Sequence, residues 1–297
     1  MKKISLFLIV IYTVSGISLE MPCFGFLGTG NKKFCGGPGG GFSKEPPGRR
    51  RLNSTVLRGA AEILDRVDQN MVFETAYTEI DMIITIKKRT ITKQMVSYSQ
   101  GNEKSFIEFL SPPRDKGTRM LKIEDIVKVY YPSAERVMRL SGHMLRQSMM
   151  GSDFSYEDMT ERATKLREEY TAEVKGEETV SQRPCYLLVL TSKIEKQTYF
   201  TRKIWVDKER FLGLKEELYA KSGKLLKVMM VEGIQTFKNR FYPTKIILED
   251  KLRQDSRTEM VIKRIDFDIP IPGEIFSERQ LLKTHPAPSG HPSQEGR

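Results

Sequence analysis

The sequence predicts a mainly β fold: a large curved antiparallel sheet that forms a half-open β-barrel, with an N-terminal helix and a helical or irregular lid. Strand-like segments with period-two alternation follow one another through most of the chain. Turn residues rather than helices connect them, so neighbouring strands pair antiparallel. One irregular segment rich in methionine and aromatic residues interrupts the series. A twisted sheet of this many strands curls into a barrel or half-barrel.

The first expected element is an amphipathic helix over 54–69, because apolar residues recur there at helical spacing. Its apolar face is expected to hold Leu57, Ala60, Ala61, Leu64 and Val67.

The period changes to two after residue 76. Ile80, Met82, Ile84 and Ile86 alternate with polar residues, interrupted only by Ile83, which is typical of a strand with one buried face. By the same criteria, further strands are expected over 91–98, 106–109, 120–123, 127–131, 186–190, 200–206, 214–220, 225–231, 244–248 and 259–267.

The segment from Ser141 to Arg167 has no strand period, and residues 158–167 could form a helix. Its many apolar side chains predict a lid over the concave face of the sheet, which we define as Ser141 to Met159. Methionine suits surfaces that accept apolar ligands of variable shape, although a single methionine beside a sheet is more often simple core. The residues expected to line a ligand cavity or form the lid are Met144, Met149, Met150, Phe154, Tyr156 and Met159.

Four regions divide the 297 residues. Residues 1–18 are predicted to be a signal peptide, because Lys2 and Lys3 precede a short apolar run that is followed by small residues. The alternative is that this segment is retained as a membrane anchor. We expect residues 19–53 to form a Gly/Pro-rich flexible tether, residues 54–283 a single domain, and residues 284–297 a disordered tail. Cys23 and Cys35 lie in the tether and could pair in an oxidising compartment.

Sequence features of catalysis are weak, and we expect no enzyme activity, cofactor or metal site. His143 is the only histidine inside the expected domain. Asp153, Glu157 and Asp158 lie near it in sequence and could form a metal or acid/base site, but a solvated acidic loop is the favoured interpretation. Cys185 begins an apolar strand and is expected to be a buried structural thiol.

The formal net charge of +11 raises the question of nucleic acid. Basic residues are interspersed with acidic ones, as in Lys122–Asp125, whereas a nucleic-acid surface clusters one sign and exposes aromatic residues. We therefore expect no nucleic-acid partner. Removal of Lys2 and Lys3 leaves +9, a modest bias towards contact with an anionic membrane surface.

A series of motifs in fixed order resembles the bacterial periplasmic outer-membrane lipoprotein-sorting protein family, in its uncharacterised branch with a LolA-like fold. The resemblance covers about Tyr77 to Lys283 and is carried by Phe109–Gly117, Tyr130–Val137, Gln147–Asp158, Gly176–Val180 with Arg183–Tyr186, Trp205–Glu209 and Tyr242–Lys245.

This resemblance implies a periplasmic carrier that holds acyl chains of lipoproteins or other lipids in an apolar barrel cavity and moves them between inner and outer membrane. It also implies association with an inner-membrane exporter of the RND type. Two alternatives remain: an envelope interaction module that docks such an exporter without holding a ligand, and a hydrolase that uses His143 and a carboxylate.

Overall fold

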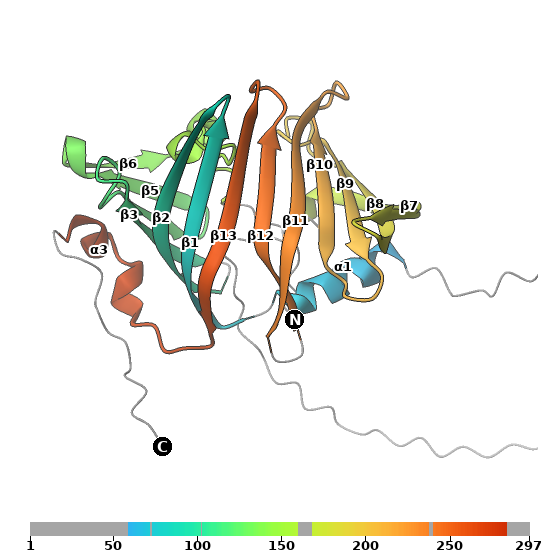
Figure 1. The fold of residues 1–297 in the computed structure, drawn as a ribbon, viewed down its shortest axis with the longest axis horizontal. Coiled ribbons are helices and arrows are strands. Elements are labelled where there is room, and N and C mark those ends of the chain that lie inside the picture. Colours follow the sequence, from blue (N-terminus) through green and yellow to red (C-terminus); the bar gives the residue numbers. More distant parts are fainter. Residues whose placement is uncertain (1–58, 72, 102, 160–167, 238–239, 284–297) are drawn as a thin grey trace, which may run out of the picture. The chain divides into compact units, whose positions relative to one another are not determined.

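A computed structural model describes residues 59–283, except 72, 102, 160–167 and 238–239. Thirteen strands in this part of the chain form one antiparallel sheet in the order β6-β5-β4-β3-β2-β1-β13-β12-β11-β10-β9-β8-β7 (Figure 1). The strands are β1 (Thr75–Ile86), β2 (Arg89–Gln100), β3 (Lys104–Ser111), β4 (Arg119–Ile123), β5 (Ile126–Tyr131), β6 (Arg136–Leu140), β7 (Tyr170–Val180), β8 (Arg183–Ser192), β9 (Thr201–Asp207), β10 (Gly213–Tyr219), β11 (Leu225–Phe237), β12 (Arg240–Asp250) and β13 (Ser256–Phe267).

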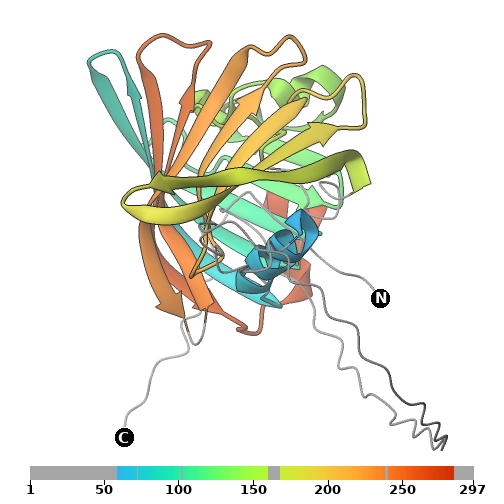
Figure 2. The same cartoon turned by 90° about the vertical axis from the view of Figure 1, so that its right-hand side faces the viewer.

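The sheet is strongly curved (Figures 1 and 2). It does not close into a barrel, because β6 and β7, the two ends of the described strand order, do not pair with each other. The predicted fold class, a curved antiparallel sheet in the shape of a half-open barrel, is confirmed. The expected signal peptide, tether, cysteine pair and tail lie outside the described residues, as does most of the helix expected over 158–167. Within the described part, no helix is both long and apolar enough to cross a bilayer.

Strand β1 shows how the alternating sequence builds the sheet. Ile80, Met82 and Ile84 are buried on the concave face, while the intervening residues are half-buried on the other face. β1 pairs with β2 and β13, so Met82 lies beside Met260 of β13. The central strand therefore contributes a continuous apolar row to the concave face.

The N-terminal helix α1 (Ala60–Asn70) covers one end of this concave face. Its buried stripe holds Ala60, Ile63, Leu64 and Val67. Asn70 fixes its end, because its side-chain amide donates to the carbonyls of Arg210 at 2.7 Å and of Phe211 at 3.0 Å.

The described helix begins at Ala60, after Gly59 in an extended conformation, and the part expected over 54–58, with Leu57, lies outside the described residues. One detail of the predicted helix is wrong. Ala61 is exposed and Ile63 is buried, since the buried stripe is set by where the helix contacts the sheet.

Two strands were missed by the sequence prediction, and both are edge strands. Strand β6 is mostly exposed, and β7 alternates half-buried residues with exposed ones such as Glu173 and Lys175. Edge strands carry charged side chains that discourage further pairing, so their sequences lack the apolar alternation of central strands.

The convex face is covered at β3 and β4 by the C-terminal segment. The 3₁₀ helix η4 (Gly273–Phe276) and helix α3 (Glu278–Leu282) place Ile275, Phe276 and Leu281 against Phe106 and Leu121. Arg119 joins this segment to the sheet, because it bonds the buried Glu108 carboxylate at 3.1 Å and the Leu281 carbonyl at 3.2 Å.

We predict that Leu281→Ala destabilises the protein by about 2–5 kcal/mol, because it leaves a cavity between α3 and the sheet. Leu281 is fully buried, whereas its neighbour Leu282 is 56% exposed. Leu282→Ala should change the free energy of unfolding by less than about 0.5 kcal/mol. Chemical denaturation of both variants measures the difference, and equal effects would contradict the packing of α3.

Candidate functional site: the lid and the concave face

The concave face of the sheet carries one continuous apolar cluster. It unites residues from α1, from strands on both sides of β13, and from the lid, Ser141 to Met159. Met82, Phe109, Leu188, Ile204 and Met229 represent the strands in this cluster, and each is essentially inaccessible to solvent. The lid therefore packs into the curve of the sheet from the end opposite α1 (Figure 2).

The lid has an irregular backbone built from two 3₁₀ helices, η2 (Gly142–Arg146) and η3 (Met149–Gly151). Its backbone hydrogen bonds join lid residues to one another: Met149 N–H donates to Phe154 at 2.7 Å, and Glu157 N–H donates to Leu145 at 2.6 Å. An isolated β-bridge pairs Ser148 with Ser155. These bonds make the lid a locally closed loop that is attached to the sheet through side chains.

The structure brings the predicted lid residues to the apolar cluster to different degrees. Met149, Phe154, Tyr156 and Met159 are buried members of the cluster, with Phe154 fully inaccessible. Met144 and Met150 are half-buried and pack against it. The Tyr156 hydroxyl lies 3.0 Å from that of Tyr131 at the end of β5.

One attachment of the lid is made by Asp153. Its carboxylate accepts hydrogen bonds from Ser256 at 2.5 Å and Thr258 at 2.7 Å, both on β13. Arg253, in the β12–β13 turn, donates to the carbonyl of Ser152 at 2.6 Å. Asp153 is 2% exposed, so the favoured expectation of a solvated acidic loop is wrong here.

The second attachment is made by Asp158, which is also buried. Its carboxylate accepts a hydrogen bond from the Tyr199 hydroxyl at 2.5 Å and lies 2.5 Å from Lys227 Nζ on β11. Within the lid, the same carboxylate accepts from Ser155 N–H at 2.7 Å, and the Ser155 hydroxyl accepts from Asp158 N–H. Burial, followed by the negative charge of Asp158, raises the pKa of Tyr199 well above its ordinary value.

A buried ion pair lies next to this attachment. Arg202 of β9 contacts Glu216 of β10 at 3.1 Å, and both side chains are completely inaccessible. The Arg202 guanidinium also lies over the rings of Tyr170 and Tyr199, at 5.3 and 5.4 Å from their centroids. Burial raises the pKa of the Glu216 carboxyl to about 7, although Arg202 lowers it.

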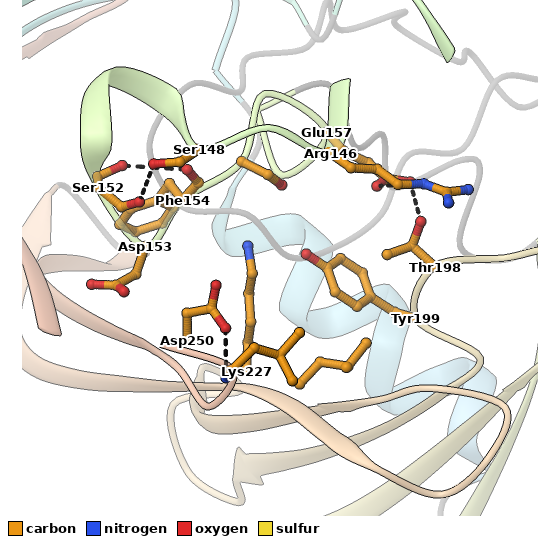
Figure 3. Close-up of a pocket in the computed structure, with 13 residues that line it drawn as sticks. Arg146, Ser148, Ser152, Asp153, Phe154, Glu157, Thr198, Tyr199, Lys227 and Asp250 are labelled. Carbon is orange, nitrogen blue, oxygen red and sulfur yellow. Dashed lines mark hydrogen bonds and ion pairs between the residues drawn. The ribbon is translucent and has the colours of Figure 1, made fainter. Parts of the chain in front are cut away.

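A cavity of about 230 Å³, which we call the seam pocket, lies between the lid and the strand ends (Figure 3). Lid residues line one wall, and Tyr199 and Lys227 lie across from them. The full lining is Arg146, Ser148, Ser152, Asp153, Phe154, Ser155, Glu157, Thr198, Tyr199, Leu226, Lys227, Asp250 and Leu252. The pocket thus marks the boundary along which the lid meets the sheet.

The residues considered for catalysis are not assembled into a reactive site. His143 is exposed in η2 and does not line the seam pocket, whereas Asp153 and Asp158 are occupied by the attachments of the lid. Among the described residues, no group of His, Cys, Asp and Glu has a geometry that could hold a metal ion. Cys185 is a buried free thiol, as predicted, and burial raises its pKa to about 11.

Sequence reasoning missed Tyr199 and Lys227, which hold the lid, and the buried pair of Arg202 and Glu216 next to them. Arg202, Glu216 and Lys227 occupy positions in their strands where alternation places buried side chains. Charged residues at such inward positions are a signal that could have identified them.

The family model that matches residues 101–283 is described as that of an uncharacterized protein. No curated protein matches the chain.

Solved structures resemble most of the chain. A DUF1329 family protein from Desulfovibrio piger ATCC 29098 is 26% identical, with a TM-score of 0.70 over 75% of this chain and 97% of that one. A putative outer membrane lipoprotein-sorting protein domain from Vibrio parahaemolyticus is 20% identical, with a TM-score of 0.69 over 75% and 98%. A LolA superfamily protein from Nitrosomonas europaea is 23% identical, with a TM-score of 0.63 over 75% and 99%.

We predict that Glu216 makes stability depend on pH. Because its pKa is raised in the folded state, the folded chain holds this proton to higher pH than the unfolded chain does. Its contribution is present at low pH and is lost as pH rises through about 7. The free energy of unfolding of the wild type minus that of Glu216→Gln should fall by up to about 3 kcal/mol between about pH 5 and 8.

Glu217→Gln provides a control of opposite sign. Burial raises the pKa of Glu217, but hydrogen bonds from Lys215 and Tyr219 outweigh it and lower the pKa overall. The free energy of unfolding of the wild type minus that of Glu217→Gln should therefore rise with pH in the acidic range. For Glu216→Gln, a difference from the wild type that stays constant or rises between about pH 5 and 8 would contradict the burial of the Glu216 carboxyl.

Proposed function

We propose that the chain, which belongs to the family of uncharacterized proteins matched over residues 101–283, is a carrier of acyl chains with a LolA-like fold. In this proposal the lid is displaced from the concave face when a lipid or the acyl chain of a lipoprotein enters. The observation that carries it is that Phe154 and Met149 of a locally closed loop fill an apolar face otherwise built from strands and α1.

The energetics of exchange support displacement of the lid. Withdrawing the four buried lid side chains, Met149, Phe154, Tyr156 and Met159, into water costs about 1.5–3 kcal/mol each, or about 6–12 kcal/mol together. An acyl chain gains about 0.8 kcal/mol for each buried CH₂, so about a dozen such groups offer about 10 kcal/mol before the cost of association. These magnitudes are comparable, which suits a ligand that must be both bound and released.

The chemistry of the two attachments also supports movement of the lid as one unit. Its internal bonds can persist when it moves, because the links to β11 and β13 are made by the side chains of Asp153, Asp158 and Lys227. Ionised groups regain hydration on exposure to water, which offsets part of the loss of their contacts. The closed lid is therefore held firmly only while the apolar face has no better occupant.

In this proposal the carrier has no enzymatic activity. It acts in the periplasm, where it moves lipid between the inner and outer membranes. The apolar run that follows Lys2 and Lys3 supports export. An inner-membrane exporter of the RND type is the proposed partner for loading, and cross-linking in the native envelope tests it.

An interaction module that holds no ligand is the second candidate. The observation that favours it is the same filled concave face, since the described lid and strand side chains are already packed together. The two functions differ in what happens when the lid is loosened, because only a carrier exposes a site for an acyl chain.

We predict that Asp153→Asn and Asp158→Asn each increase the affinity for a fluorescent long-chain fatty acid by about three- to tenfold. Each substitution weakens one attachment of the lid, by about 1 kcal/mol for a typical hydrogen bond, and so lowers the cost of displacing it. Titration of the fatty acid into purified protein measures the change, with circular dichroism to verify folding.

Asp250→Asn is the matched control, because Asp250 lines the seam pocket but bonds the turn residue Leu252 rather than the lid. The affinity of Asp250→Asn for the fatty acid should equal that of the wild type. Absence of binding in the wild type and in both lid variants, although all are folded, would favour the interaction module over the carrier.

A further inference from the structure

Four hairpin turns lie side by side along one edge of the sheet. They connect β1–β2, β12–β13, β10–β11 and β8–β9 at residues 87–88, 251–255, 220–224 and 193–200, and we call them the crest. Antiparallel pairing in this strand order places all four at the same edge, which is uppermost in Figures 1 and 2.

The crest is strongly basic. Its turns contain eight Lys and Arg against two Asp and Glu. The four described turns of the opposite edge, at 101–103, 124–125, 181–182 and 208–212, contain two Lys and Arg against four Asp and Glu. The charge is therefore concentrated on one edge of a sheet whose convex face carries mixed ion pairs such as Lys245 with Glu259.

Aliphatic side chains at and beside the crest are exposed among these lysines. Ile91 is 51% exposed next to Lys88 and Arg89, and Leu252 is 56% exposed next to Lys251. Ile86 and Ile194 are also exposed at the ends of their hairpins. Aliphatic tips surrounded by lysine suit the boundary between lipid headgroups and acyl chains.

The crest also borders the lid. Leu252 at the tip of the β12–β13 turn, Leu226 after the β10–β11 turn and Thr198 in the β8–β9 connection all line the seam pocket. A surface that contacts the crest thus faces the line along which the lid separates from the sheet.

We propose that the crest docks on a bilayer that contains anionic lipid and presents the seam pocket to it. This inference rests on the proposed carrier function, for which it names the surface where acyl chains enter and leave. Charge complementarity selects the occupant, because each lysine near an anionic bilayer adds attraction and the exposed Ile and Leu side chains can enter it. A nucleic-acid strand would instead require exposed aromatic rings for stacking.

Flotation with vesicles tests the docking. The full chain is mixed with vesicles of phosphatidylcholine alone, or of phosphatidylcholine and phosphatidylglycerol in equal parts. The wild type should float with the anionic vesicles, and added salt should weaken the association. Lys88→Glu/Lys224→Glu should weaken it by about tenfold or more, and Leu252→Asp should also weaken it.

Matched controls separate the crest from general charge and hydrophobicity. Leu282 on α3 is 56% exposed, like Leu252, so Leu282→Asp removes an equally exposed leucine elsewhere. Lys104→Glu/Arg279→Glu changes the net charge by the same amount away from the crest. Both controls should bind anionic vesicles as the wild type does.

The outcomes distinguish docking from carriage. Equal losses in crest and control variants, or flotation that does not depend on phosphatidylglycerol, would overturn the crest as the docking surface. The fatty-acid affinity of Lys88→Glu/Lys224→Glu should remain that of the wild type, so a failure of docking leaves the carrier measurement intact. Loss of vesicle binding together with unchanged fatty-acid binding supports the inference.

Discussion

An open curved sheet with an apolar concave face must cover that face, and the rest of this structure depends on how the cover is supplied. The described sheet ends in two edge strands, β6 and β7, so its curvature alone leaves the face open. Helix α1 covers one end and the lid covers the other, and together with the strands they form one apolar cluster. A cover that is part of the core stabilises the closed form, yet it occupies the space in which a ligand would be held.

The polar contacts of the lid determine how that cover is kept in place. Buried carboxylates are costly unless they are paired, and Asp153 and Asp158 each receive several hydrogen bonds from the sheet or its turns. The buried pair of Arg202 and Glu216 lies next to the second attachment, in which Lys227 pairs with Asp158. Each buried carboxylate in this region therefore has a basic partner. These contacts fix one position of an otherwise irregular loop, which apolar packing alone would define less sharply.

The fold could be predicted from the sequence because strand alternation, as in Ile80, Met82 and Ile84, reports burial directly. The edge strands could not, since β6 is short and mostly exposed, with arginine at two of its five positions. Methionine and aromatic content identified the lid, and the structure buries Met149 and Phe154 as part of it. Lys227 and Tyr199 were missed because their partner Asp158 lies far away in the sequence.

The central claim is that an acyl chain displaces the lid from the concave face. Hydrogen exchange of the lid amides, with and without a saturating long-chain fatty acid, tests it most directly. The account predicts faster exchange at Asp153, because its N–H donates to the Thr258 hydroxyl of β13 at 2.9 Å and loses this acceptor when the lid leaves the sheet. It also predicts unchanged or slower exchange in β11 and β13. Unchanged or slower exchange at Asp153, under conditions where the fatty acid is bound, would contradict it.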